Sequence, residues 1–481
     1  MSETTVIRSA AWVVAWDEAD QRHVYLRDAD VAFAGSDIVQ VGGRYDGSAA
    51  TEIAGGDVMV MPGLVNIHSH PTSEPMNKGI TDEILSPNFH HSSLYEFLPV
   101  LGNDAEGTAP CHKVAMAELL RSGCTTVVDY SMPFDGWLDL LAEAGIRACV
   151  APSFRDAPWR TRDGHLLEYD WSDTQRGPQG LERAKRTIDL AQQHPSGRLT
   201  GMMSPAQIDT CSSDLLQQAH SHATERNLPF QIHAAQSVNE FTEMVRRHGR
   251  TPIQWMDDIG ILTERTIVGH GIFLDHHPWL HWTTRKDLDL LAERGATVAH
   301  CPTVFMRRGI ALNTFGGYLR HGINLGIGTD TYPHNILDEM RNAATVARAV
   351  AGTVADLKTE DVFNAATIGG ARALRRDDIG RLSVGAKADL VLVDLSCPAM
   401  RPLREPLRSL IFCAAERAVR DVYVDGRQVV RDGTCLTIDI DRELDALEAA
   451  QRRSVARVPE LDWAGRSIDE LAPMALAVKK A

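Results

Sequence analysis

Apolar residues are distributed differently at the two ends of the chain and in its middle. Over residues 5–60, short apolar runs alternate with turns, and no helical period of useful length is present. The same pattern returns near the C-terminus, where Leu390–Val393 is typical of a strand and Val422–Val430 of a strand, a turn and a second strand. Two strand-rich pieces that flank a long middle predict one small β domain built from both chain ends.

The middle of the chain alternates strands with helices. A helical stretch at Cys111–Ser122 precedes the apolar run Thr125–Tyr130, and another at Leu215–Arg226 precedes Phe230–His233. This alternation predicts βαβ units and a parallel sheet. Further candidate strands bring the number to eight, which is enough to close a barrel. These further strands are Gly63–Ile67, Arg147–Ala151, Thr200–Ser204, Thr266–Gly269, Thr297–His300 and Asn324–Gly328.

The predicted fold class is therefore α/β, a (β/α)8 TIM-type barrel with a small discontinuous β-sandwich domain from both chain ends. The barrel is expected over residues 62–380, and the composite β domain over 1–61 and 381–440. Residues 441–481 are expected to form a helical C-terminal extension, and their sequence indicates no function. The polar, proline-containing stretch 155–180 predicts a loop over the mouth of the barrel.

Composition narrows the functional classes. The chain of 481 residues is 44% hydrophobic and 23% charged, as a globular enzyme would be, and its net charge of −15 argues against a nucleic-acid partner. The eight cysteines contain no CxxC pair, which favours reduced thiols. No signal peptide precedes the first strands and no apolar stretch is long enough to span a membrane, so a cytoplasmic protein is expected.

Histidines and an aspartate stand where the predicted strands end, which is where barrel enzymes place their active sites. His68 and His70 follow the first barrel strand, and because side chains alternate along a strand the two imidazoles face the same side. His233, His270 and Asp330 end three later strands. Any one of these residues alone is more often structural, but four such strand ends in this order predict a metal centre.

The residue types suggest the chemistry. Imidazoles with one carboxylate suit zinc, or iron or cobalt. A catalytic divalent metal lowers the pKa of a bound water from about 15.7 to roughly 7, which provides a hydroxide nucleophile at neutral pH. Asp330 can hold the metal and also take the proton of the water, while a remaining histidine can orient the water or stabilise a developing oxyanion.

These motifs resemble the amidohydrolase superfamily, in particular the branch of atrazine chlorohydrolase-like enzymes, hydroxyatrazine aminohydrolase and guanine deaminase. The similarity covers nearly the whole chain. The matching elements are Met61–His70, Ala115–Asp129, Ser204–Leu216, Ala299–Thr303, Gly380–Asp394 and Val424–Arg427.

The resemblance implies a ligand set and a number of metals. His68, His70, His233 and Asp330 would bind the metal, and His270 would be a second catalytic residue or the ligand of a second metal. Binuclear members carry a bridging lysine or acid on the fourth strand, and residues 200–205 contain neither. The expectation is therefore one divalent metal per chain, zinc first, with iron or cobalt as alternatives. A small-molecule substrate and a homodimer or larger homo-oligomer are also implied.

One departure from the resemblance affects the substrate. Deaminases of this branch usually carry HxxE after the fifth strand, whereas this chain has Gln236 three residues after His233. A glutamine cannot deliver a proton to a leaving nitrogen but can hydrogen-bond a carbonyl or amide. Gln236, Tyr332 and His334 are therefore predicted to bind substrate, the last two because their segment is similar to enzymes that hydrolyse phenylurea and thiocarbamate herbicides.

The sequence thus favours a hydrolase that cleaves a non-peptide C–N bond of an N-substituted amide, urea or carbamate. The alternative is an aminohydrolase, deaminase or dechlorinase of an N-heterocycle such as a triazine or purine. A catalytically silent binding protein on the same barrel is a third possibility, which the intact set of strand-end residues disfavours.

Overall fold

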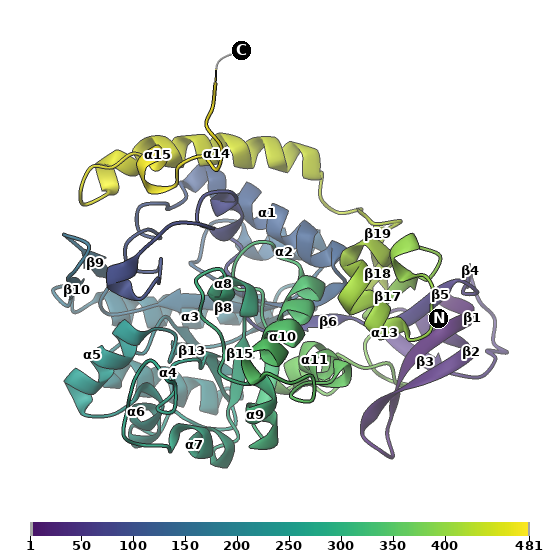
Figure 1. Cartoon of the computed structure of the whole chain (residues 1–481). Coiled ribbons are helices and arrows are strands. Elements are labelled where there is room, and N and C mark those ends of the chain that lie inside the picture. The colour runs from purple at the N-terminus through teal and green to yellow at the C-terminus, as the bar shows by residue number, and fades with distance from the viewer. Residues whose placement is uncertain (1–2, 480–481) are drawn as a thin grey trace.

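Two parallel sheets, one of five strands and one of four, lie at the centre of the computed structural model, which describes residues 3–479 (Figure 1). The strands of the first sheet are β6 (Leu64–Asn66), β7 (Cys124–Ser131), β8 (Arg147–Phe154) and β11 (Leu199–Gly201), with the short β12 (Ser204–Pro205) paired to β8. Those of the second are β13 (Phe230–Ala234), β14 (Thr266–His270), β15 (Thr297–His300) and β16 (Asn324–Ile327). The α/β class and the parallel pairing predicted from the sequence are confirmed.

Hydrogen bonds join the two sheets at both edges. At one edge, Ile67 N donates to Ile327 O over 3.0 Å. At the other, Met203 N donates to Pro229 O over 3.1 Å and Gln231 N to Met203 O over 2.9 Å. The sheets therefore continue into one another on both sides, and the carboxyl ends of all their strands face the same end of the molecule.

Helices between the strands cover the sheets from outside. Strands such as β7 and β13 are buried at every residue, because helices cover one face and the opposite strands cover the other. In helix α4, the buried residues Leu215, Ala219 and Ala223 recur at a spacing of four, which gives one apolar stripe. The helices are α1 (Ala105–Arg121), α2 (Trp137–Ala144), α3 (Arg176–Gln192), α4 (Ser213–Glu225), α5 (Val238–His248), α6 (Pro252–Asp258), α7 (Asp287–Glu293), α8 (Pro302–Met306), α9 (Phe315–Arg320), α10 (Ile336–Ala351) and α11 (Thr359–Asn364).

The two chain ends meet in one nine-stranded sheet, at the right of Figure 1. Its strands are β1 (Thr4–Asp17), β2 (Arg22–Ala34), β3 (Asp37–Val41), β4 (Thr51–Ala54), β5 (Val58–Pro62), β17 (Leu390–Asp394), β18 (Val419–Val424), β19 (Arg427–Arg431) and β20 (Thr434–Cys435). The join is the antiparallel pairing of β17 with β5, in which Val391 faces Met61. The packing of two layers as a sandwich, and the exact domain boundaries, stay predictions.

A buried ion pair connects this sheet to the barrel. Arg147, at the start of β8, donates from Nε to Asp389 Oδ2 over 2.8 Å and from Nη2 to Asp389 Oδ1 over 3.0 Å. Its Nη2 also donates to Asp425 Oδ1 over 2.9 Å. Arg147 and Asp389 are almost fully buried, so this two-pronged contact fixes the sheet against the strand.

The stretch 155–180 is not a plain loop, contrary to expectation. It contains the hairpin formed by β9 (Trp159–Thr161) and β10 (Leu167–Tyr169), and it also contains the first turn of α3. Tyr169 pairs directly with Trp159 across the hairpin, and aromatic cross-strand pairs of this kind stabilise short strands.

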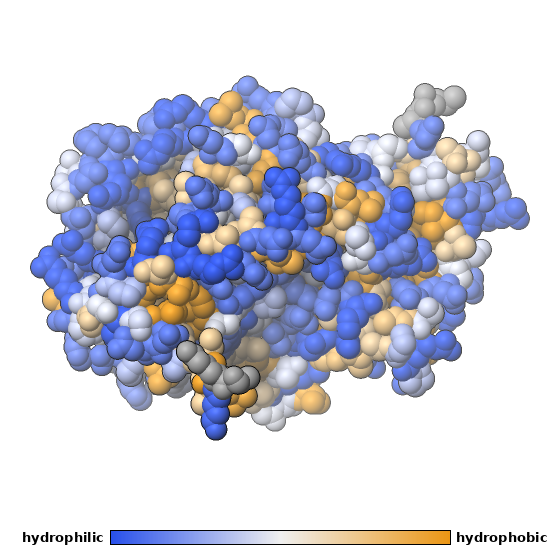
Figure 2. Space-filling view, turned by 90° about the horizontal axis from the view of Figure 1, so that it is seen from above, coloured by the Kyte–Doolittle hydropathy of each residue, from blue (hydrophilic) through white to orange (hydrophobic). Residues whose placement is uncertain are grey.

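Helix α14 (Ile440–Leu461) lies beside α1 at the top of Figure 1, and the short α15 (Ile468–Leu471) lies against α14. Arg453 of α14 pairs with Asp104, the residue that caps α1, at 2.6 and 2.9 Å. The face that they occupy is mostly hydrophilic, with separate hydrophobic patches (Figure 2). Within the described residues, the helices are all too short or too polar to cross a membrane.

The link between sheet and barrel generates a prediction about stability. Asp389→Ala should lower the free energy of unfolding by about 3–5 kcal/mol, because it leaves the buried Arg147 guanidinium largely unpaired. The matched control is Asp378→Ala, which removes a two-pronged but more exposed pair with Arg376 and should cost at most about 1 kcal/mol. Urea denaturation followed by circular dichroism measures both, and equal losses would contradict the assignment.

Candidate functional site

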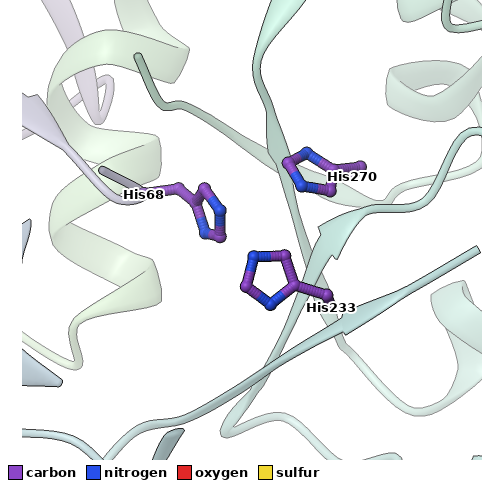
Figure 3. Close-up of side chains that lie close together, drawn as sticks. All are labelled: His68, His233 and His270. Atoms are coloured by element: carbon purple, nitrogen blue, oxygen red, sulfur yellow. The ribbon is translucent and has the colours of Figure 1, made fainter. Parts of the chain in front are cut away.

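Five side chains converge at the carboxyl ends of the parallel strands. His68 and His70 follow β6, His233 lies in β13, His270 ends β14, and Asp330 follows β16. Asp330 Oδ1 lies 3.4 Å from His68 Nε2 and 3.3 Å from His70 Nε2. Figure 3 shows the rings of His68, His233 and His270 grouped around a common centre. The structure therefore brings together every residue of the predicted metal centre.

Three of the imidazoles are oriented through Nδ1. Each has a carbonyl oxygen within hydrogen-bond distance of that nitrogen, which fixes the proton there and leaves Nε2 as a lone pair. The three contacts are His68 Nδ1 with Gln231 Oε1 at 3.1 Å, His70 Nδ1 with Tyr130 O at 2.8 Å and His233 Nδ1 with Ala206 O at 2.6 Å. The Gln231 amide is itself oriented, because its Nε2 donates to Ile67 O over 2.9 Å.

The Nε2 atoms therefore face one another without protons. Those of His70 and His233 are 3.2 Å apart, and that of His68 is buried without a hydrogen-bond partner. Two groups, His68 with His233 and His270, and His68 with His70 and Asp330, each present ligand atoms within 4.8 Å of one another. Converging lone pairs beside a carboxylate repel one another unless a cation lies between them. The donor set therefore fits a divalent metal.

The backbone and burial of the centre are unusual. His270 has φ 86° and Asp330 has φ 57°, a left-handed conformation that costs energy in residues other than glycine and concentrates at functional sites. Burial lowers the pKa of His270 to about 3, so its imidazole is neutral. Burial alone would raise the pKa of Asp330, but the imidazoles of His270 and His68 outweigh it and hold that pKa below its ordinary range.

A cavity of about 490 Å³ is lined by four of the five residues, all except the fully buried His68. Its apolar lining includes Leu94, Leu98, Trp159, Phe305 and Ile310. Its polar lining includes Glu74, Arg155, Gln207, Gln236 and Arg308. A cavity of this volume, with an apolar part and many polar groups, is suited to a small polar organic molecule.

Gln236 lines this cavity as predicted from the sequence. The residue is buried, and its Nε2 has no hydrogen-bond partner, so the amide can donate to a bound molecule. The neighbouring Glu240 does not replace the missing acid, because its carboxylate accepts from Ala235 N over 2.6 Å and from Gln236 N over 3.2 Å.

Tyr332 and His334 do not line the cavity. The Tyr332 hydroxyl bonds to Thr81 Oγ1 at 2.8 Å, and His334 is fully buried beside Glu118, with its backbone N donating to Glu118 Oε2 over 3.1 Å. The chain begins α10 at Ile336, soon after Asp330, and neither side chain is part of the cavity lining. The expectation that they contact substrate finds no support here; Thr331 lines the cavity in their place.

Sequence reasoning missed three charged residues of the cavity. Arg155 directly follows β8, so the strand-end rule that found the histidines would also have found it. Glu74 lies four residues after His70, and burial, together with the nearby charge of Asp330, raises the pKa of Glu74 to about 8. Arg308 follows the short helix α8, in a stretch where no sequence pattern marks it.

Comparison with known proteins places this site in a family context. The model of the Amidohydrolase family matches residues 59–429. The 5'-deoxyadenosine deaminase of Methanosphaera stadtmanae is 28% identical over 457 residues, which is 94% of this chain and 100% of that protein. The 5-methylthioadenosine/S-adenosylhomocysteine deaminase of Nitratidesulfovibrio vulgaris is also 28% identical, over 94% of this chain and 98% of that protein.

Two solved structures are also similar to this chain over nearly its whole length. An adenosine deaminase from Xanthomonas campestris with bound zinc has a TM-score of 0.76 and 27% identity, covering 95% of this chain and 98% of that one. The atrazine chlorohydrolase TrzN from Arthrobacter aurescens TC1, complexed with zinc, also has a TM-score of 0.76, at 21% identity over 93% of this chain and 100% of that one. The second likeness is one of fold alone.

Proposed function

Because this chain belongs to the amidohydrolase family and is a hydrolase of C–N bonds other than peptide bonds, we propose that it is a metal-dependent aminohydrolase. Its proposed substrate is a small N-heterocycle with an exocyclic amino group, first of all a 6-aminopurine nucleoside. The observation that carries the proposal is the convergence of His68, His70, His233, His270 and Asp330 below a cavity suited to such a molecule. Full-length similarity to deaminases supports the substrate class.

The preferred substrate class differs from the one that the sequence alone favoured. Amide, urea or carbamate cleavage came first there, and deamination or dechlorination of an N-heterocycle was the alternative. Relatives named as deaminases match nearly the whole chain, and this favours the alternative. Gln236 remains the specific observation in favour of an N-substituted amide, urea or carbamate, since its amide is suited to a carbonyl group.

One divalent metal per chain is proposed, held by His68, His70, His233 and Asp330, with zinc first and iron or cobalt as alternatives. When bound, such a metal supplies Lewis-acid activation of water at neutral pH. The three imidazoles would hold it through Nε2, because their Nδ1 atoms are occupied by carbonyl groups.

The remaining groups handle protons and orientation. Asp330 Oδ2, which lies 3.8 Å from His270 Nε2, accepts the proton of the attacking water. The His270 imidazole orients that water and stabilises the negative charge that develops on the reacting centre. Gln236 Nε2 donates a hydrogen bond to the substrate. Glu74, on the lining of the same cavity, begins protonated and donates its proton to the leaving nitrogen, and the proton that Asp330 took from the water then restores the Glu74 carboxyl group. Glu74 thus supplies the leaving-group proton that the amide of Gln236 cannot supply.

The metal assignment gives a direct prediction. The protein should contain about one divalent ion per chain, and His68→Ala or His233→Ala should remove most of that ion because each deletes a ligand. His248→Ala, outside the site, should leave the metal content unchanged. Elemental analysis of the purified variants measures this, and full occupancy in His68→Ala would remove His68 from the ligand set.

The substrate class is tested with a panel. The metal-loaded enzyme should release ammonia from 5'-deoxyadenosine, 5'-methylthioadenosine or S-adenosylhomocysteine, with the ultraviolet change of a 6-aminopurine that loses its amino group. Phenylureas and N-alkyl carbamates complete the panel, with amine release as the readout. Turnover confined to the ureas or carbamates would establish the Gln236-based candidate in place of deamination.

The proton assignments predict kinetic losses. Asp330→Asn and Glu74→Gln should each lower kcat by about 10²-fold or more, since each removes a group that transfers a proton. Glu83→Gln changes an exposed carboxyl in the same segment as Glu74 and should have no effect. Steady-state kinetics and metal analysis are measured together, and an unchanged kcat in Glu74→Gln with metal retained would assign the leaving-group proton to another residue.

A further inference from the structure

One wall of the active-site cavity is formed by residues 86–101, here named the cavity wall. On its inner side, Ser92, Ser93, Leu94, Leu98 and Pro99 line the cavity. On its outer side, Phe97, Val100 and Leu101 pack in one hydrophobic cluster with Val458 of α14 and Leu471 of α15. The cavity wall therefore lies between the substrate space and the C-terminal helices.

The cavity wall has little regular structure to hold it in place. It contains turns and the single short helix η2 (Pro87–Phe89), and none of its residues belongs to a strand. The metal-centre residues differ in this respect, since they adjoin strands fixed by backbone ladders. The position of the cavity wall must therefore depend on contacts from outside the segment.

The strongest of these contacts meet at Glu96. This side chain is only 7% exposed, and its Oε2 accepts from Ser86 Oγ within the cavity wall over 2.9 Å. Its Oε1 accepts from two residues of the C-terminal segment, Trp463 Nε1 over 3.1 Å and Arg466 Nη2 over 2.9 Å. Arg466 is held in turn by Asp462, with Nη2 to Oδ1 at 2.8 Å and Nε to Oδ2 at 3.0 Å.

The neighbour of Glu96 reaches the catalytic side of the cavity. The hydroxyl of the fully buried Tyr95 lies 2.6 Å from Ser237 Oγ. Ser237 directly follows Gln236 and caps α5 by accepting from Glu240 N over 3.0 Å. A shift of the cavity wall at Glu96 would therefore move both the lining of the cavity and the residue beside Gln236.

We propose that Trp463 and Arg466 are positioning residues of the active site, which act through Glu96 to hold the cavity wall against the substrate. The C-terminal segment thus contributes to substrate fit without touching the substrate. The kinetic part of this inference rests on the proposed function, whereas the structural part does not. The contacts of Trp463 and Arg466 with Glu96 are here named the tether. Because the five residues of the metal centre take no part in it, loss of the tether should change KM and leave kcat and metal content intact.

Three variants of the full chain test the tether. Arg466→Gln and Glu96→Gln remove the ion pair, and Trp463→Phe removes one N–H donor while keeping an aromatic ring against Gly164. Each should raise KM about tenfold or less, the effect of one lost charge-assisted hydrogen bond, with kcat within about twofold. Arg466→Lys should restore part of the loss. Hydrogen–deuterium exchange in peptides covering 86–101 should accelerate in the same variants.

Arg453→Gln is the matched control, because it removes a two-pronged ion pair from α14 to Asp104 that does not involve the cavity wall. It should lower Tm without changing KM or the exchange of residues 86–101. The inference is overturned if exchange of that segment is the same in Arg466→Gln and Arg453→Gln, a result that needs no substrate. Loss of kcat and metal in Trp463→Phe, the mildest variant, would also overturn it, since it would show a general disturbance of the centre.

Discussion

Imidazole lone pairs that point at one another are the constraint around which this structure is organised. Nitrogen atoms 3.2 Å apart without a proton between them are stable only when a cation balances them and when the rings cannot rotate away. Rotation is prevented by carbonyl oxygens from Tyr130, Ala206 and the Gln231 side chain. These acceptors belong to β7, to the segment after β12 and to β13, so the centre depends on the mutual placement of several strands.

That placement in turn depends on backbone contacts at the centre and on side-chain contacts far from it. The two parallel sheets join through backbone hydrogen bonds that involve the metal-centre residues themselves, such as Asp330 N to His68 O at 2.9 Å. At the opposite end of β8, Arg147 fixes the strand to the terminal sheet through Asp389. The left-handed backbone at His270 and Asp330 is of the kind that persists only where the surrounding structure fixes it.

The sequence was informative wherever a periodic pattern determines the direction in which a side chain points. Alternation in a strand places His68 and His70 on one side, and parallel strands bring their carboxyl ends together, so the five residues were predicted as a group. Periodicity says nothing about side chains in the segments between elements. Tyr332 and His334 follow Asp330 closely in sequence but do not line the cavity, while Glu74 and Arg308 reach the cavity from segments without a period. The sequence predicted that both strand-rich chain ends form one domain. It did not predict which strand near the C-terminus pairs with β5.

The pairing of β17 with β5 also has a consequence for synthesis. A ribosome produces β5 before any barrel strand, and its antiparallel partner only after the barrel has been completed. Until then one edge of β5 has unsatisfied backbone groups, and an exposed apolar edge is a site for misassociation. The terminal sheet is therefore completed last, when β17 pairs with β5. This pairing closes a very long loop of chain, and the barrel lies entirely within that loop. A nascent chain that stops before residue 390 contains all five residues of the centre but lacks the strand that closes the sheet beside it.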